Sequence, residues 1–181
     1  MRCLAVLLWF AAISLRAQTP TPTDSTRVDS TATPAPPAPP TPEQKRFLDG
    51  LRTATRGVAQ LKDGVSRVTR AGRDSLAQRR AGRFLAGLCG SGRAFLKRGR
   101  PRMVPTVYED SAGLKARRLV TQLDTLIGYA PTCEQKAAGA PDATATELGK
   151  RMKSYDAALR DFRVAIGLPV KDDTSKTVKR Q

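Results

Sequence analysis

The sequence predicts an all-α fold, an antiparallel bundle of about four helices joined by one interhelix disulfide. Three observations lead to this prediction. Apolar residues recur every three or four positions in four separate segments, which is typical of amphipathic helices. No segment alternates apolar and polar residues as a half-buried strand does. Two cysteines remain once the first few residues are set aside. We expect the bundle to occupy residues 42–169.

The start of the chain has the layout of a secretory signal peptide over residues 1–17. Arg2 precedes an apolar run from Leu4 to Leu15, and the small residue Ala17 follows. This run of 12 residues is too short to span the roughly 30 Å hydrocarbon core of a bilayer. We therefore expect cleavage after Ala17 and a secreted or periplasmic protein; a retained anchor is the alternative.

Two further segments lack an apolar period. Residues 18–41 are rich in Thr, Ser, Pro and Ala, a composition that does not bury enough surface to offset the entropy of ordering. We expect a disordered linker there and a flexible polar tail over residues 170–181.

The first helix is expected from Pro42 to about Ala71. Thr41 has the position of an N-cap, Pro42 suits the first helical position, and Gln44 completes a capping box. Its apolar stripe consists of Phe47, Leu51, Ala54, Val58, Leu61, Val65 and Val68.

Beside that stripe, Gly50, Gly57 and Gly64 are seven residues apart. Each glycine costs a helix interior about 1 kcal/mol relative to alanine. We expect them to admit a close neighbouring helix; the alternative is that they only loosen the helix.

The second helix is expected to be capped by Asp74 or Ser75, with Gln78 closing a capping box on Ser75. Glycines at positions 90 and 92 predict that it ends or kinks just past Cys89, and prolines at 101 and 105 predict a loop through about residue 110. Its expected core positions are Leu76, Ala77, Ala81, Phe84, Leu85 and Leu88.

A third helix is expected from about Ser111 to Tyr129, ended by Pro131. A fourth is expected to begin near Asp142 or Thr144, where Thr144 and Glu147 have capping-box spacing. The core positions of these two helices are Ala112, Ala116, Leu119, Leu123, Leu126 and Ala130, then Leu148, Met152, Tyr155, Leu159, Phe162 and Ile166.

Cys3 lies within the signal peptide and is expected to leave with it, so that Cys89 and Cys133 remain. In an exported protein an even number of cysteines predicts a disulfide. Two buried thiols are the alternative. Joining them requires either that the loop after the second helix makes helices two and three roughly parallel, or that the second helix ends early.

The charge is strongly positive and uneven. The chain carries 32 Lys and Arg against 16 Asp and Glu, and residues 43–102 hold 16 of these bases but only 4 of the acids. The excess of positive charge in residues 43–102 favours anionic partners. A solvated surface or a bias in genome composition would give the same number of basic residues. The predicted anion-binding residues are Arg79, Arg80, Arg83, Arg93, Lys97, Arg98, Arg100 and Arg102.

Several chemistries are not expected. The chain has no histidine, which removes the commonest general base and metal ligand. Gly82 and Gly87 have phosphate-loop spacing, but Leu88 and Cys89 stand where that loop needs Lys and Ser or Thr. Two cysteines alone do not make a closed zinc site. We predict no catalytic residues, no cofactor and no metal.

The sequence therefore predicts an exported, non-enzymatic binding or structural module. Its basic helices would contact an anionic envelope polymer, lipid head groups or an acidic protein; specific nucleic-acid recognition is not expected, because no known module or row of stacking aromatics is present. One alternative is a membrane-surface protein whose first helix lies in the interface. The other is an enzyme of unrecognised type.

Overall fold

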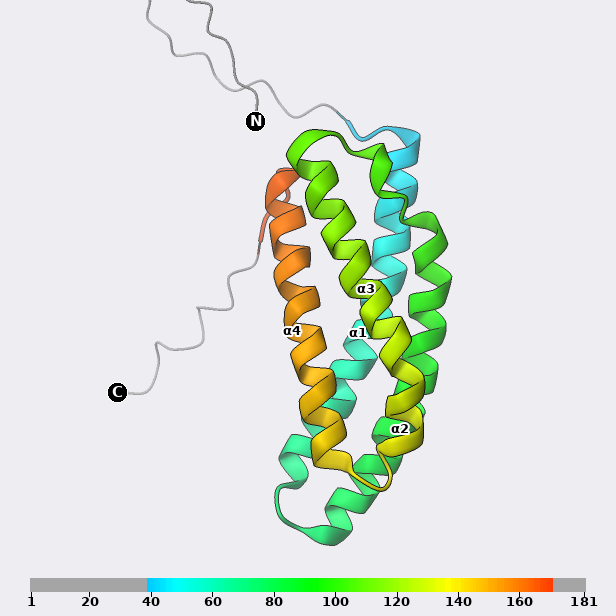
Figure 1. The fold of residues 1–181 in the computed structure, drawn as a ribbon, viewed down its shortest axis with the longest axis vertical. Coiled ribbons are helices and arrows are strands. Elements are labelled where there is room, and N and C mark those ends of the chain that lie inside the picture. Colours follow the sequence, from blue (N-terminus) through cyan, green and yellow to red (C-terminus); the bar gives the residue numbers. More distant parts are fainter. Residues whose placement is uncertain (1–38, 171–181) are drawn as a thin grey trace, which may run out of the picture. The chain divides into compact units, whose positions relative to one another are not determined.

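The computed structural model describes residues 39–170, which form four long helices and no strand (Figure 1). The helices are α1 (Pro42–Ala71), α2 (Ser75–Gly99), α3 (Asp110–Lys136) and α4 (Pro141–Ala165), with two 3-10 turns, η1 (Arg100–Arg102) and η2 (Pro105–Val107), between α2 and α3. The predicted all-helical bundle is confirmed. The expected signal peptide, most of the expected linker and the tail from residue 171 lie outside the described residues.

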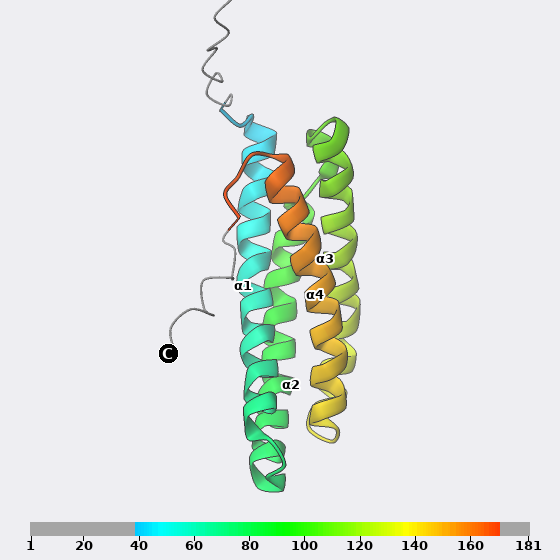
Figure 2. The same ribbon diagram turned by 90° about the vertical axis from the view of Figure 1, so that its left-hand side faces the viewer.

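Consecutive helices run antiparallel and form a closed ring, in which α1 packs against α2 and α4, and α3 packs against the same two helices (Figures 1 and 2). Helices α2 and α3 are therefore not parallel, one of the two arrangements that the sequence left open. Instead α2 ends below the start of α3, and η1 and η2 continue along the beginning of α1.

The start of α1 is the capping box that the sequence predicts. The Gln44 amide N–H donates to Thr41 Oγ1 at 3.2 Å, and the Thr41 amide N–H donates to Gln44 Oε1 at 3.0 Å. The apolar stripe of α1 is also confirmed, since all but one of its members are buried and Val65 is half-buried.

The glycines of α1 lie where α2 comes closest, as predicted. A Cβ on Gly57 would lie 2.7 Å from the Gly92 carbonyl oxygen, and one on Gly50 would lie 2.8 Å from the Gly99 carbonyl oxygen. The contact is reciprocal, because a Cβ on Gly99 would lie 2.5 Å from the Gly50 carbonyl oxygen. Real Cβ atoms do not make such contacts, so only glycine permits this separation of the two backbones.

Helix α2 neither ends nor kinks after Cys89, and that prediction was wrong. It continues to Gly99 because Gly92 and Gly99 are used for contact with α1 rather than for a helix end. Tertiary packing here outweighs the low helix propensity of glycine.

The expected capping box on Ser75 is also absent. Asp74, one of the two predicted caps, is the N-cap of α2, and its carboxylate accepts from the Leu76 and Ala77 amides. The Gln78 side chain instead donates to the Gly72 carbonyl at 2.6 Å and to Asp142 Oδ1 at 2.8 Å. It thereby connects the end of α1 to the start of α4.

Pro131 does not end α3, contrary to the prediction. The helix continues to Lys136, and the buried side chains of Cys133 and Ala137 hold its last turn and the following residue against the core. Proline removes only one backbone donor, and the burial of this turn compensates for it.

Thr144 does not cap α4 either. The helix begins at Pro141, and the Thr144 hydroxyl donates back to the Ala140 carbonyl at 2.7 Å.

The residues between α2 and α3 contribute to the core, which the sequence did not predict. Met103 is fully buried and Tyr108 is nearly so. Tyr108 packs edge-on against Phe47 and Phe162, with ring centroids 5.2 and 5.1 Å apart. This aromatic cluster closes the end of the bundle beyond the end of α2.

Cys89 and Cys133 lie within disulfide distance, with Cα atoms 6.0 Å apart and both residues fully buried. Neither is at a helix end, since Cys89 lies in the middle of α2 and Cys133 one turn before the end of α3. The bond would join α2 to α3 on the flank of α2 that does not contact the glycines of α1.

Replacing Gly57 with alanine is predicted to lower the free energy of unfolding by about 2–3 kcal/mol, because the new methyl group meets the α2 backbone. Gly87→Ala is the matched control, since nothing lies within 4 Å of its Cβ position in the same bundle. That substitution should raise stability by about 0.5–1 kcal/mol. Equal effects of the two substitutions in urea unfolding would contradict the close contact.

Reduction of the cysteine pair is predicted to lower the unfolding free energy by about 4 kcal/mol, the chain-entropy value for a loop that spans 44 residues. Denaturant unfolding with and without reductant measures the change, and the Cys89→Ala, Cys133→Ala double variant should show no effect of reductant. Two titratable thiols in the oxidised, purified protein would refute the bond.

Candidate anion-binding surface

The eight basic residues predicted to bind anions lie in one segment of the structure without acidic residues. Between Asp74 and Glu109 the chain contains no Asp or Glu. Six of the eight belong to α2, and Arg100 and Arg102 belong to η1. All are exposed except Arg93 and Arg100, which are half-buried.

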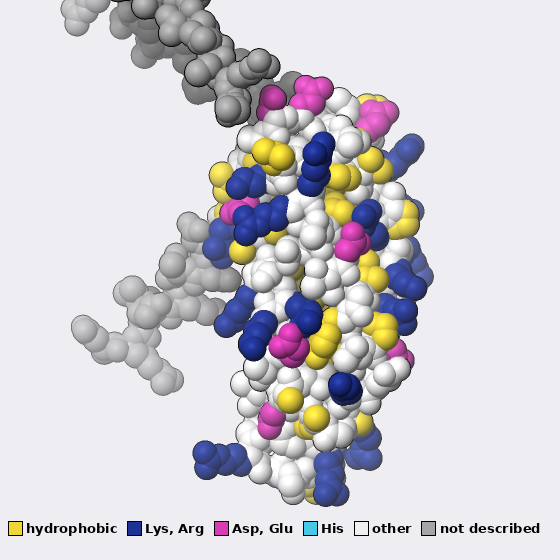
Figure 3. Space-filling view, viewed as in Figure 1, with side chains coloured by type: hydrophobic (Ala, Val, Ile, Leu, Met, Phe, Trp, Pro, Cys, Tyr) yellow, Lys and Arg dark blue, Asp and Glu magenta, His cyan; other side chains and the backbone are white. Residues whose placement is uncertain are grey.

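The six residues of α2 share one side of the helix but form two groups. Arg79, Arg80 and Arg83 lie in its first turns, and Arg93, Lys97 and Arg98 in its last turns. Arg83 and Arg93 are ten positions apart, about 15 Å along the helix axis at 1.5 Å per residue. Dark blue side chains accordingly line the right-hand edge of the molecule, where α2 lies (Figure 3).

Only one of the eight predicted anion-binding residues forms an ion pair. Arg100 makes a two-point contact with Asp124 of α3, with Nε to Oδ1 at 2.6 Å and a terminal nitrogen to Oδ2 at 3.0 Å. The other seven have no carboxylate within ion-pair distance among residues 39–170. The Glu134 carboxylate lies beside Gly90, between the two groups. The surface therefore consists of two positive regions rather than one continuous stripe.

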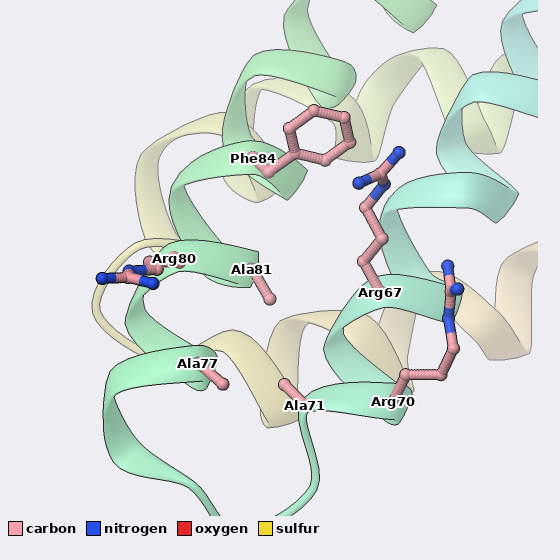
Figure 4. Close-up of a pocket in the computed structure, with 7 residues that line it drawn as sticks. All are labelled: Arg67, Arg70, Ala71, Ala77, Arg80, Ala81 and Phe84. Atoms are coloured by element: carbon pink, nitrogen blue, oxygen red, sulfur yellow. The ribbon is translucent and has the colours of Figure 1, made fainter.

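Sequence reasoning missed a groove between the end of α1 and the start of α2 (Figure 4). Its volume is about 460 Å³, and its floor is made of alanines and Phe84. The Arg67 guanidinium points across the groove and lies 4.0 Å from the centre of the Phe84 ring. Arg70 lies beside Arg67 on α1, whereas the guanidinium of Arg80 points away from the groove.

Phe84 and Leu76 were predicted to face the core, and this was wrong. Phe84 is 41% exposed and Leu76 55% exposed. Phe84 lies at the edge of the apolar face of α2. Its neighbour Leu85 takes the buried position and packs on Gly64. The register of the two antiparallel helices was the missing information, because it places Arg67 opposite Phe84.

Four of the nine basic residues of α3 and α4 form ion pairs, namely Lys115, Arg118, Lys150 and Arg151. Lys62 of α1 contacts Asp156 at 2.8 Å, and Asp161 accepts from Arg118. Arg151 donates to Glu147, and this hydrogen bond lowers the pKa of the Glu147 carboxyl. Helices α3 and α4 also carry seven acidic residues, whereas α2 and η1 carry eight basic residues and no acidic one, so the net positive charge is highest on α2 and η1.

The described part of the chain brings no group of potential metal ligands together. No cluster of three Cys, Asp or Glu side chains with metal-ligand geometry occurs between residues 39 and 170. None of the helices in that range has the length and apolar character needed to cross a bilayer.

Comparisons with protein families, curated proteins and solved structures found no match to this chain.

Tyr155 is the one fully buried tyrosine of the described residues, and burial raises its pKa to about 12, an effect that the neighbouring Thr55 hydroxyl opposes. Its hydroxyl has no hydrogen-bond partner of normal geometry among the described residues. The side chain lies in the core rather than in a cavity, so the raised pKa affects the stability of the fold and not a binding site.

The raised pKa of Tyr155 predicts a loss of stability at high pH. Below the unfolded value of about 10 both states hold the proton, and between 10 and 12 only the folded state does, so that unfolding becomes easier as the pH rises. Tyr155→Phe should remove up to about 2–3 kcal/mol of this loss. Its stability at pH 7 should change by less than about 1 kcal/mol, because no hydrogen bond is lost. Parallel pH profiles of the two proteins between pH 9 and 12 would refute the assignment.

Proposed function

We propose that this protein is an exported, non-enzymatic binding module that holds an anionic partner on α2 and the adjoining end of α1. The partner is an anionic envelope polymer, lipid head groups or an acidic protein. The observation that carries the proposal is the run between Asp74 and Glu109, residues 75–108, which contains eight basic residues and no acidic one. Seven of the eight have no ion-pair partner among the described residues.

The physical basis is electrostatic. Unpaired guanidinium groups on one side of a helix attract phosphate, sulfate or carboxylate groups, and a polyanion gains further free energy by releasing its counterions. Arginine presents a planar set of donors that suits two-point contacts with such groups. Binding of this kind weakens steeply as salt rises.

Export is supported by the layout of residues 1–17 and by the cysteine pair at disulfide distance. A buried disulfide is typical of an oxidising compartment such as the periplasm or the extracellular space.

The alternative in which α1 lies flat in a membrane interface has less support. Its large apolar side chains, among them Phe47 and Leu61, are fully buried against the other helices. The bundle would have to open before this face met lipid.

Substitution of three outward residues of α2 tests the proposal. The wild-type protein should be retained on heparin at low salt and released as salt rises. The variant Arg79→Gln, Arg83→Gln, Lys97→Gln should elute at clearly lower salt, because these exposed side chains share one side of the helix.

The matched control is Arg117→Gln, Lys153→Gln, Arg160→Gln, which removes the same charge from exposed positions on α3 and α4. It should shift elution much less. An equal shift for both variants would mean that only net charge matters, and absence of wild-type retention on heparin and on anionic vesicles at low salt would reject the proposal.

A further inference from the structure

The α1–α2 hairpin projects beyond the loop that joins α3 to α4 (Figures 1 and 2). Its end, residues 67–83, is here named the hairpin tip. It contains six arginines and one acidic residue, Asp74, whose carboxylate is occupied with the amides at the start of α2. The arginines are Arg67, Arg70, Arg73, Arg79, Arg80 and Arg83.

Apolar side chains are exposed within and beside this positive region. Leu76, near the turn, is 55% exposed, and Phe84, one residue past the tip, is 41% exposed. Gly72, with φ of 57°, makes the turn that precedes them. The groove of about 460 Å³ lies between the turn and Phe84.

The other carboxylates near the tip offset only part of its charge. Asp63 pairs with Arg67 at 3.0 Å, and Asp142 accepts from the Gln78 amide at 2.8 Å. Arg70, Arg73 and Arg80 have no ion-pair partner among residues 39–170.

The opposite end of the bundle differs in charge. It too exposes apolar side chains, including Leu114 at 65%, but carboxylates such as Glu109 and Asp110 lie beside them, and acidic side chains gather at that end in Figure 3. Exposed apolar side chains also lie beside basic residues near the end of α4, where Leu168, 41% exposed, lines a groove with Arg52, Arg56 and Arg163. The hairpin tip differs in its concentration of charge, with six arginines and one acidic residue within 17 residues.

We propose that the hairpin tip docks on an anionic phospholipid surface. Lipid phosphates lie among Arg70, Arg73 and Arg80, and the Leu76 side chain enters the head-group region. A soluble polyanion would make no use of an exposed leucine, whereas a bilayer interface stabilises both an apolar side chain and its flanking arginines. This inference rests on the proposed function, because it names the partner and the point of contact for the same positive surface.

Vesicles of phosphatidylglycerol and phosphatidylcholine test the docking by co-sedimentation. The wild-type protein should bind the anionic vesicles and not pure phosphatidylcholine. Arg70→Gln, Arg73→Gln, Arg80→Gln should weaken binding about 100-fold, near fivefold per charge, and the control Arg117→Gln, Lys153→Gln, Arg160→Gln by less than tenfold. Leu76→Ser should weaken it about three- to tenfold, whereas Leu114→Ser at the other end should leave it unchanged.

Retention on heparin separates the two proposals. Two outcomes would overturn lipid docking and keep a polyanion-binding module. In the first, the wild-type protein is retained on heparin but does not bind vesicles. In the second, Leu76→Ser leaves vesicle binding intact, while the Arg70, Arg73, Arg80 variant loses heparin and vesicle binding equally. Failure of the wild-type protein to bind either heparin or anionic vesicles would reject both. Unchanged thermal melting of each variant shows that the losses come from the surface.

Discussion

The close contact between the glycine-bearing faces of α1 and α2 determines much of this structure. Gly50 and Gly57 on one helix meet Gly99 and Gly92 on the other, so that backbone touches backbone at two points one heptad apart. A third contact, in which Leu85 packs on Gly64, uses the same seven-residue spacing. Such packing fixes the register of the hairpin, because a shift of one residue would place side chains where only glycine fits.

The register in turn places the charges. It sets Arg67 of α1 across from Phe84 of α2 and brings the arginines of both helices to the same end of the molecule. Unpaired like charges repel one another and so destabilise the bundle. The dispersion energy and the burial gained along the glycine contact offset this destabilisation. Concentration of unpaired positive charge on one hairpin is therefore consistent with use of the surface rather than with stability of the fold.

The sequence predicted the features that depend on local pattern. The apolar stripes of α1, α3 and α4 and the Thr41–Gln44 capping box were predicted from spacing. The proximity of Cys89 and Cys133 was predicted from the even number of cysteines in an expected exported protein. Helix ends were predicted less well, because Gly92 and Pro131 are ordinary signals for a helix end that burial of the following turns overrides here. The groove at Phe84 depends on the register between two helices, which no single segment of the sequence contains.

The proximity of the α1 and α2 backbones is tested most directly by nuclear Overhauser effects between glycine Hα protons in the folded, oxidised protein. The account predicts strong cross-peaks from Gly57 to Gly92 and from Gly50 to Gly99, since each pair lies in backbone contact. A well-folded helical protein that lacks both cross-peaks would contradict the close packing, and with it the register that assembles the positive surface.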